Sequence, residues 1–392
     1  MNMYKKINKC LCCGSKKISQ FLNLGSQPLA NNLAENYQQD TEEFPLCVNY
    51  CNSCWHSQLS ISVNPEILFK DYYYVTGTSK TMQNYCEVLS RDIYKRTGHI
   101  STKNKKILDI ASNDGTFLSK FSKYNWILHG VDPAENLSKL CKEKGVRTHV
   151  NFFGSDEIDF GTKFDVITAL NVFAHVPNPL DFLLECKKHM TETGIIVIQT
   201  SQRDMVIKRQ FDTVYHEHIS FFSVKSMVAI CKRAGLFLND ISLPEIHGGS
   251  YVFYISKSNK VGQSVKDRIG FEEQENLYNK KTYQKYQEDI SSLSCVIKSK
   301  LKHKSLVGFG AAAKGIVALH SLGLNPDFII DENPLKIGKI LPKKNIPIVD
   351  ISKLSEIEDD LDIIILPWNF KNEISEKIKD IRRNRDNLIC IF

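Results

Sequence analysis

Short apolar runs alternate with amphipathic stretches through the middle of the chain. The runs at residues 105–110, 127–131, 164–169 and 194–199 have the length and the β-branched content of buried strands. Helical patterns precede the first run, at 80–100, and separate the later ones. Strands that alternate with helices predict a mostly parallel sheet, with ligands at the carboxyl ends of the strands.

The last part of the chain repeats this pattern. Apolar runs at 306–309, 328–330 and 363–366 predict strands, and a glycine- and alanine-rich turn with Gly310 and Lys314 follows the first of them. Residues 262–303 are polar with apolar positions at helical spacing, which predicts one long helix that leads into this second Rossmann-like unit.

Cysteines are concentrated near the start of the chain. Cys10 and Cys13 form one CxxC pair, and Cys51 and Cys54 form another. Each pair brings two thiolates to one tetrahedral ion, so we predict a structural zinc site with all four positions filled by protein. Redox dithiols are the alternative, and Cys12 and Cys47 are spare thiols in this interpretation.

Composition narrows the class of protein. The chain has 392 residues, 42% of them hydrophobic and 24% charged, with a formal net charge of +7. The lysines are spread along surface-like segments, which weakly favours an anionic small molecule and argues against nucleic acid. The first residues have no apolar core behind them and no run is long enough for a bilayer, so we expect a cytoplasmic protein without a membrane segment.

The turn after the first strand of the central domain separates two ligand classes. A dinucleotide fold favours three glycines at GxGxxG spacing, whereas Ala111, Asn113 and Gly115 stand here. The Asn113-Asp114-Gly115 turn and Asp132, which ends the second strand, better fit S-adenosylmethionine (SAM), because an acidic residue there can bind both ribose hydroxyls of an adenosine ligand. A methyltransferase is therefore favoured over a dehydrogenase.

The run from Tyr215 to Ser223 carries the strongest candidate chemistry. Its Tyr-His-Glu-His start offers imidazoles that titrate near neutral pH, a carboxylate that can fix an imidazole tautomer, and a phenol that can donate to an oxyanion. The structural alternative is a set of polar residues at a loop or strand edge, with one histidine in the core. The loop that follows the tyrosines at 72–74 is rich in hydroxyl groups, which suits a cover over a polar ligand.

Taken together, these motifs resemble those of the sugar C-methyltransferases. The likeness rests on the paired CxxC motifs, the Ser-Asn-Asp-Gly turn, Gly-Val-Asp-Pro, Asn-Val-x-x-His-Val, Tyr-His-Glu-His and the late Gly-x-Gly-Ala-x-Ala-Lys-Gly, and it covers essentially the whole chain. The family methylates nucleotide-linked keto-deoxysugars, most often at C3. It implies an α/β architecture with a zinc-binding module (1–75), a SAM-binding domain (76–258), a linking helix (259–303) and a Rossmann-like C-terminal domain (304–392).

The resemblance also implies roles for individual residues. The catalytic motif falls on Tyr215, Glu217 and His218, with His175 as a helper and Tyr74 as the best match to a further tyrosine, although Tyr72 and Tyr73 blur that register. The cofactor positions fall on residues of the central sheet, to which we add Asp109: Ser112, Asn113, Asp114, Gly115, Asp132 and Asn171. Ala111 departs from the family, in which glycine is common.

The chemistry of C-methylation can be assigned without the family. Removing the C3 proton of a 4-keto sugar requires a base and donors for the enolate oxygen. We predict His218 as the base, Glu217 as the group that orients it, and Tyr215, His175 or Tyr74 as donors, while His216 is structural. The alternatives are a sugar O-methyltransferase and a nucleotide-sugar-binding protein without catalysis.

Three residues are candidate contacts to the substrate. Gly310 and Lys314 can meet the diphosphate of a nucleotide sugar, with dTDP, GDP and CDP all open, although packing alone or a second dinucleotide would also explain this turn. His247 precedes two glycines that allow close approach of a ligand, or simply form a turn. The sequence does not decide between a monomer and a homo-oligomer.

Overall fold

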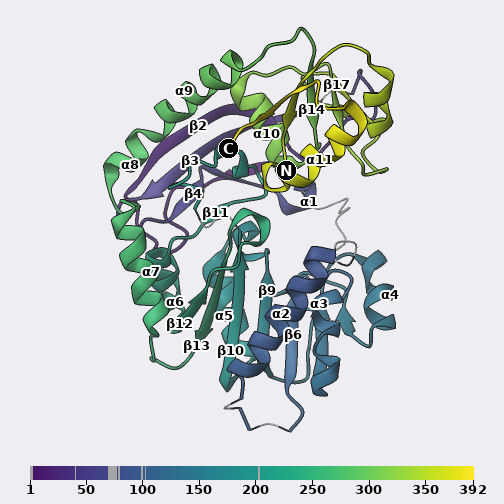
Figure 1. Cartoon of the computed structure of the whole chain (residues 1–392). Coiled ribbons are helices and arrows are strands. Elements are labelled where there is room, and N and C mark those ends of the chain that lie inside the picture. Colours follow the sequence, from purple (N-terminus) through teal and green to yellow (C-terminus); the bar gives the residue numbers. More distant parts are fainter. Residues whose placement is uncertain are drawn as a thin grey trace.

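The computed structural model describes residues 3–39, 41–68, 77, 80–98, 100–101, 103–201 and 204–392, and of His247 only the main chain. Figure 1 shows two lobes: one contains the central sheet and its helices, and the other contains the N-terminal and C-terminal parts of the chain. Helices α7, α8 and α9 run along one side, from the first lobe onto the second. The predicted α/β fold class is confirmed.

The central lobe is a seven-stranded sheet in the order β12-β13-β10-β9-β6-β7-β8. Strands β6 to β10 pair in parallel, and β12 and β13 add an antiparallel edge. The chain crosses from β8 to β9 on the other side of β6, so the carboxyl ends of β6 and β9 form a topological switch point, where such sheets bind ligands. The strands are β6 (Lys106–Ile110), β7 (Ile127–Val131), β8 (Arg147–His149), β9 (Phe164–Leu170), β10 (Met190–Thr200), β12 (Phe237–Ser242) and β13 (Tyr251–Ser256).

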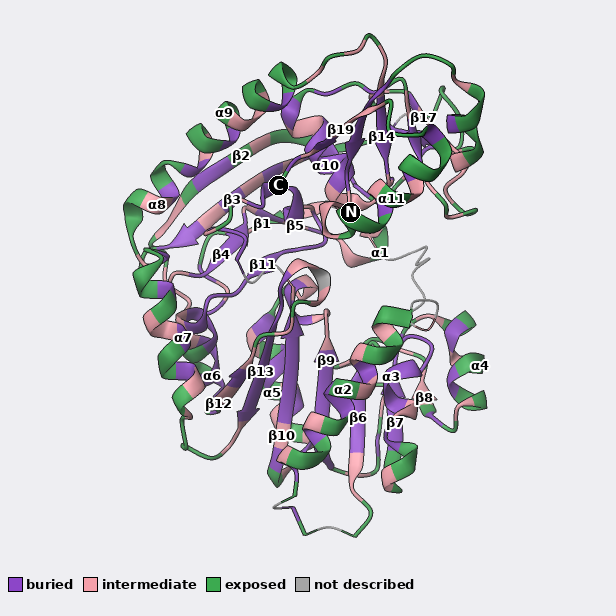
Figure 2. Cartoon of the chain, viewed as in Figure 1, coloured by how far each residue is buried: buried purple, intermediate pink, exposed green. Residues whose placement is uncertain are grey.

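Burial explains why these runs are strands. In β9, whose sequence is FDVITAL, every residue but the last is buried, as expected for a parallel strand covered on both faces. Figure 2 shows the same contrast across the lobe, with buried strands and helices that expose one face. The helices are α2 (Lys80–Arg96), α3 (Thr116–Ser119), α4 (Glu135–Glu143), α5 (Pro179–His189) and α6 (Val224–Ala234), with 3₁₀ turns η2 (Ser122–Tyr124), η3 (Phe173–His175), η4 (Phe211–Thr213) and η5 (Ile246–Gly248).

The N-terminal part builds a sheet that takes in a strand from the catalytic candidate segment. The order is β11-β4-β3-β2, and Ser220 and Phe221 of β11 pair with Gln58 and Ser57 of β4. The elements are β1 (Tyr4–Lys6), β2 (Ile18–Pro28), β3 (Glu43–Cys51), β4 (Ser57–Leu59), β5 (Ile61–Val63), α1 (Pro65–Leu68) and β11 (Ser220–Phe221). The residues after His218 are therefore held by the N-terminal module.

The C-terminal part is a six-stranded sheet in the order β16-β17-β15-β14-β18-β19, with a parallel core from β17 to β19. Its elements are β14 (Leu306–Phe309), α10 (Ala313–Leu322), β15 (Phe328–Ile330), β16 (Ile340–Leu341), β17 (Ile346–Val349), η6 (Ile351–Glu356), β18 (Asp362–Ile365), η7 (Trp368–Phe370), α11 (Lys371–Arg382) and β19 (Asn387–Cys390). It has the predicted second Rossmann-like arrangement.

The prediction of one long helix over 262–303 is wrong. The segment forms α7 (Gln263–Gln274), α8 (Lys280–Gln284) and α9 (Tyr286–Ser299). Asn276 has a left-handed φ of 56°, which interrupts the helix after α7, and the side chain of Asn279 accepts a hydrogen bond from Lys281 N and so caps α8. The apolar spacing did predict α9, which buries Tyr286, Ile290 and Ile297.

One hydrophobic core joins parts of the chain that are distant in sequence. It contains Leu22 and Leu46 of the N-terminal sheet, Phe211 of η4, Ile297 of α9 and Leu319 of α10. This core crosses all three of the proposed domain boundaries. The division into four domains stays a prediction. Within the described residues, no helix has both the length and the apolar character needed to span a bilayer.

Candidate active site

His218 lies in the link between η4 and β11, and both of its ring nitrogens have hydrogen-bond partners. Nδ1 lies 2.8 Å from the carbonyl oxygen of Thr213, and Nε2 lies 2.8 Å from the hydroxyl of Tyr215. A carbonyl oxygen only accepts, so in the neutral ring Nδ1 carries the hydrogen and Nε2 carries the lone pair. Tyr215 then donates to Nε2. This is the tautomer that a base acting through Nε2 requires.

His175 brings a second imidazole to the same place from a different strand. It ends η3, which follows β9 at the carboxyl edge of the central sheet. The ring centroids of His175 and His218 are 5.0 Å apart, with the rings nearly perpendicular at 73°. Desolvation lowers the pKa of His175 to about 4, so at neutral pH it is an uncharged imidazole that can donate one hydrogen bond.

Glu217 does not provide the orientation that the sequence analysis assigned to it. The main-chain carbonyl of Thr213 orients His218, whereas Glu217 Oε1 accepts a hydrogen bond of 2.5 Å from the side chain of Asn31. Burial raises the pKa of Glu217 to about 7, although the Asn31 bond favours the ionised form. The carboxyl group thus ties the catalytic segment to the N-terminal module. His216 has the predicted structural place: it is buried, and its Nε2–H donates to the Phe44 carbonyl 3.2 Å away.

Serine residues fix the segment on its C-terminal side. Ser220 pairs in β11 and its hydroxyl lies 3.2 Å from Nε2 of the buried His56. Ser223 caps α6 in a capping box with Ser226.

Two other candidates cannot be placed. Tyr74, with Tyr72 and Tyr73, lies outside the described residues. The main chain of His247 belongs to η5, but its side chain is outside the description as well.

The predicted cofactor turn has an unusual backbone. Ala111, Asn113 and Gly115 have φ of 56°, 51° and 73°, so alternate residues are left-handed. Ala111, which replaces the common glycine of the family, thus adopts a conformation that costs an L-residue about 1–2 kcal/mol. A methyl group on Gly115 would lie 3.2 Å from Cys141 Sγ, so glycine is needed there for space as well.

Asp132 closes this turn at the end of β7. Its Oδ2 accepts from Asn113 N at 2.9 Å, and its Oδ1 accepts from Ala134 N at 2.9 Å. Each carboxylate oxygen keeps a second lone pair, which is the acceptor set that a ribose diol requires. The hydroxyl of Ser112 is buried between Gly130 of β7 and the thiol of Cys141. The switch-point location and the buried acid fit an adenosine ligand.

The other predicted cofactor residues surround the turn. Asp109 is buried in β6 and accepts a 2.5 Å hydrogen bond from Thr168 of β9, and burial raises its pKa to about 7. Asn171 follows β9 with φ of 58°, and its N–H donates to Gln199. Burial would raise the pKa of Asp114, but hydrogen bonds from Lys144 and Thr116 lower it overall.

Gly77, which follows Tyr74 by three residues in the sequence, lies at this turn. A side chain on Gly77 would collide with the Asp114 carboxylate and the Thr116 hydroxyl, so the main chain at Gly77 lies directly against the turn. Gln83 of α2 donates to the Gly77 carbonyl at 2.6 Å.

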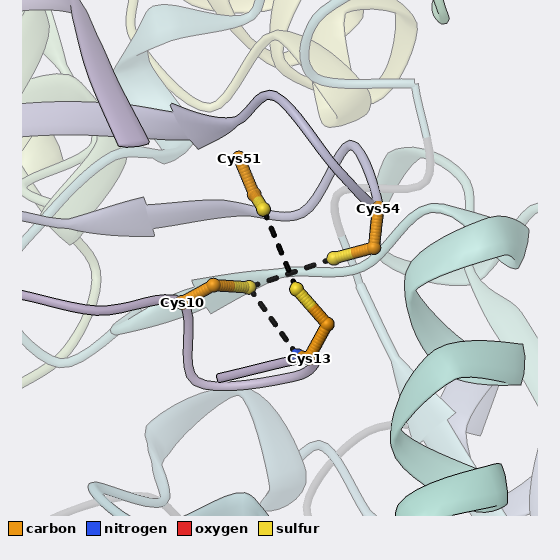
Figure 3. A group of neighbouring side chains, drawn as sticks. All are labelled: Cys10, Cys13, Cys51 and Cys54. Atoms are coloured by element: carbon orange, nitrogen blue, oxygen red, sulfur yellow. Dashed lines mark hydrogen bonds between the residues drawn. The ribbon is translucent and has the colours of Figure 1, made fainter. Parts of the chain in front are cut away.

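The paired CxxC motifs form one cluster. The sulfurs of Cys10, Cys13, Cys51 and Cys54 lie within 4.8 Å of one another, and Figure 3 shows all four pointing to a common centre. Two sulfur pairs, Cys10 with Cys54 and Cys13 with Cys51, are 3.5 Å apart. Tetrahedral zinc with Zn–S bonds of about 2.3 Å separates its sulfurs by about 3.8 Å, so the donor set fits zinc with small movements. Cys12 is buried and Cys47 bonds to Asn23, outside the cluster.

The C-terminal turn has the predicted Rossmann-like form. Gly310 has φ of 90°, and Ala311 N donates to Asp331 Oδ2 at 2.7 Å. The ammonium group of Lys314 lies 4.6 Å from the ring centroid of Trp368 and 3.4 Å from Asn369 Oδ1. Lys314 also interacts electrostatically with Asp212, which lies next to Thr213 in the chain. The turn η4 therefore connects Lys314, the predicted cation for the substrate, with His218, the predicted base.

Sequence reasoning missed four contributors to this site: the Thr213 carbonyl, Asn31, Asp212 and Trp368. A main-chain carbonyl has no sequence signature. Asn31 lies in a turn-rich stretch that the sequence displays, but its partner Glu217 is 186 residues away. Asp212 stands close before the Tyr-His-Glu-His motif, and that closeness was the available signal.

Three family models match successive parts of the chain. One described as "Putative zinc binding domain" matches residues 10–69, one described as "Methyltransferase domain" matches 81–239, and one described as "C-methyltransferase C-terminal domain" matches 245–392.

One relative is similar over almost the full chain, and other proteins are similar to a part of it. The C-methyltransferase NovU of Streptomyces niveus is 27% identical over 406 residues, which cover 99% of this chain and 96% of the relative. A ubiquinone biosynthesis O-methyltransferase of Glaesserella parasuis serovar 5 is 29% identical over 109 residues, covering 25% of this chain and 46% of the relative. The solved structure of magnesium protoporphyrin IX methyltransferase from Synechocystis PCC 6803 with bound SAH covers 48% of this chain and 90% of its own, at 8% identity and a TM-score of 0.38.

The cofactors follow from the site and the family models together: SAM in the central domain and zinc at the four cysteines. Similarity over almost the full chain is to a C-methyltransferase, whereas similarity to the O-methyltransferase is confined to a quarter of it. The protein belongs to the SAM-dependent C-methyltransferases that carry an N-terminal zinc-binding domain.

Proposed function

We propose that this enzyme methylates a nucleotide-linked 4-keto-deoxysugar at C3, through an enolate that His218 generates. The observation that carries this proposal is the 2.8 Å hydrogen bond between His218 Nε2 and the Tyr215 hydroxyl. A carbon acid and its carbonyl oxygen are separated by only two covalent bonds. A base for C3–H and a donor for the C4 oxygen must therefore be neighbours, as these two groups are.

The proton transfer can be followed atom by atom. The C3–H bond breaks, its proton goes to His218 Nε2, and its electron pair moves into the enolate. Tyr215 turns its O–H from Nε2 to the enolate oxygen, and neutral His175 supplies a second N–H donor. Preorganised donors of this kind contribute about 3–4 kcal/mol each. Bound SAM supplies an electrophilic methyl group for the C3 carbanion. Tyr74, which lies outside the described residues, stays a predicted donor.

The Thr213 carbonyl supports His218 both before and after this step. It accepts from Nδ1–H, so Nε2 is free of its own hydrogen when the substrate arrives. When Nε2 takes the proton, the same carbonyl stabilises the imidazolium. The zinc has four protein ligands and no open position, so in this proposal it is structural.

The nucleotide end of the substrate belongs, in this proposal, to the C-terminal turn. Gly310 lets the main chain come close, the N-terminus of the ten-residue helix α10 follows, and Lys314 supplies a compact cation for the diphosphate. An open pocket of about 390 Å³ lined by residues 368–373 adjoins Lys314 through Trp368 and Asn369. Its aromatic side chains, Trp368 and Phe370, suit a nucleobase. His247 is retained as a predicted contact to the sugar.

Mass spectrometry in deuterated water tests the proposal. A panel of dTDP-, GDP- and CDP-linked 4-keto-6-deoxysugars is incubated with SAM, and separately with SAH. One member should gain a methyl group on carbon with SAM and exchange its C3 hydrogen with SAH. His218→Gln should abolish both signals, while the matched histidine variant His303→Gln, in the segment before the C-terminal domain, should keep them.

Other results would contradict the proposal in identifiable ways. Methyl gain on oxygen without exchange would establish the O-methyltransferase alternative. No methyl gain on any member, with SAM binding intact, would exclude this substrate class. Full exchange in His218→Gln would assign the base to another residue.

A further inference from the structure

Asp212 is a fully buried carboxylate outside the predicted catalytic set. It lies in η4, and its Oδ2 accepts a 2.7 Å hydrogen bond from the indole Nε1–H of Trp368. Burial raises its pKa to about 6, against the opposing effects of Lys314, of Trp368 and of the main-chain N–H groups of Asp212 and Thr213. Burying a carboxylate opposes folding unless hydrogen bonds compensate, so the bond from Trp368 helps to hold Asp212 inside the protein.

The C-terminal part of the chain encloses the turn that contains Asp212. Helix α10 contacts η4, and the Phe392 ring lies 5.9 Å from the Phe211 ring and 5.7 Å from the Trp368 ring. Gly248 lies against the six-membered ring of the Trp368 indole, where an added side chain would come within 2.7 Å of Cη2. Trp368 is therefore held in place, and its N–H is a fixed donor for Asp212.

The same turn sets the orientation of His218. Thr213, the next residue, gives its N–H and its hydroxyl to the Gln210 carbonyl, at 3.2 and 2.7 Å. Its own carbonyl then accepts from His218 Nδ1 at 2.8 Å. Any rotation of the peptide at 212–213 moves this acceptor. The ammonium group of Lys314 lies over the face of the Trp368 indole, 4.6 Å from the ring centroid.

We propose that Asp212 is a positioning residue for His218. Its hydrogen bond with Trp368 fixes the peptide whose carbonyl selects the histidine tautomer, and so connects the C-terminal nucleotide site to the base. This inference rests on the proposed role of His218 as the base. It assigns to Asp212 no contact with the reacting atoms.

Three variants separate the hydrogen bond from the charge. W368F removes the donor and keeps an aromatic ring between Lys314 and Phe392, and D212A removes the acceptor. D212N keeps an oxygen that can accept from the indole and removes the charge. D362N is the matched control, because Asp362 is also fully buried but lies in β18 and bonds to Lys302, His303 and Asn387.

The direct readout is the ¹⁵N NMR spectrum of histidine-labelled full-length protein at pH 8, with the His218 signals identified by their loss in H218Q. Wild type and D362N should show a protonated Nδ1 and a lone pair on Nε2. In W368F and D212A these signals should shift toward a mixture of tautomers. In D212N, which keeps the acceptor oxygen, they should stay as in the wild type. C3 exchange with the sugar of the panel should slow about 100-fold in W368F and D212A, the usual effect of a small misplacement. In D212A, which leaves the proposed nucleobase pocket intact, KM should change less than about threefold.

The outcomes distinguish this inference from the proposed function. Unchanged His218 signals in W368F and D212A, with zinc content and SAM binding intact, would overturn it. A tautomer shift in D212N would overturn it as well, and that variant decides the matter if the other two do not fold. Altered His218 signals in an enzyme whose wild type exchanges no sugar would support positioning and refute the substrate proposal.

Discussion

Asp132 and Asp331 hold the same position in the two Rossmann-like units. Asp132 follows β7 and accepts from Asn113 N in the turn after β6, and Asp331 follows β15 and accepts from Ala311 N in the turn after β14. The second oxygen of each accepts from a main-chain N–H two residues on, at Ala134 and Asn333. One carboxylate thus closes each turn, and each of its oxygens keeps a lone pair.

This equivalence gives a matched pair of variants. D132N should raise the Kd of SAM about 10- to 100-fold, because a hydrogen bond to a charged group contributes about 1.5–3 kcal/mol. D331N should leave the Kd of SAM unchanged and weaken binding of the nucleotide sugar instead. Calorimetric titration of both ligands into both variants measures this. Equal effects of the two variants on SAM would show that the acids act only on folding.

Tyr215 gives a prediction about turnover. Y215F removes the hydroxyl that contacts His218 Nε2 at 2.8 Å and that we assign to the enolate oxygen. Methyl transfer and C3 exchange should both fall about 100- to 1000-fold, as for the loss of one oxyanion donor. The Kd of SAM should stay the same, because its predicted residues lie on the central sheet.

The control for this change is Y37F, since Tyr37 is 55% exposed on the N-terminal part of the chain. Initial rates by mass spectrometry compare the two variants. A Y215F enzyme that keeps wild-type exchange but loses methyl transfer would remove Tyr215 from enolate formation.

The sequence predicted those parts of the site that depend on local spacing. Two CxxC pairs can bind one ion whatever lies between them, and an acid at the end of the second strand is fixed by the strand itself. The cluster at Cys10 and the turn closed by Asp132 were found for this reason.

The remaining features depend on contacts between distant segments. Glu217 neighbours His218 in sequence, but its hydrogen bond goes to Asn31, and a main-chain carbonyl orients the histidine instead. The break after α7 was missed because Asn276 can stay in a helix or leave it, and packing decides. Trp368 of η7 and Asp212 of η4 are 156 residues apart in the sequence and meet only in the folded chain.

The pKa of Glu217 predicts a pH-dependent stability difference. Burial raises it from 4.5 to about 7, so between these pH values the folded protein holds a proton that the unfolded chain has lost. Stability from this group is present below about pH 4.5 and is lost as the pH rises toward 7. E217Q keeps an acceptor for Asn31 and cannot ionise. It should therefore be more stable than wild type by up to about 3 kcal/mol at pH 8 and equal to it at pH 4.5.

Urea unfolding across this pH range measures the difference. E358Q, at an exposed glutamate, should follow wild type throughout. A constant difference between E217Q and wild type at all pH values would contradict the assigned pKa, since only an ionising group makes the difference depend on pH.

Zinc removal should affect the base more than the cofactor site. After Cys54, Trp55 accepts from the Ser223 hydroxyl, His56 contacts Ser220, and β4 pairs with β11, so the metal site supports the strand that follows His218. C51S should lose its zinc by elemental analysis, melt on the order of 10 °C lower, and exchange amide hydrogens faster at 218–223, because zinc binding energy is folding energy. SAM binding should persist, because Asp132 and the turn at 111–115 belong to a different sheet.

The control is C47S, whose sulfur lies outside the cluster and which should keep zinc and activity. Zinc loss with unchanged exchange at 218–223 would show that the metal stabilises the N-terminal module alone.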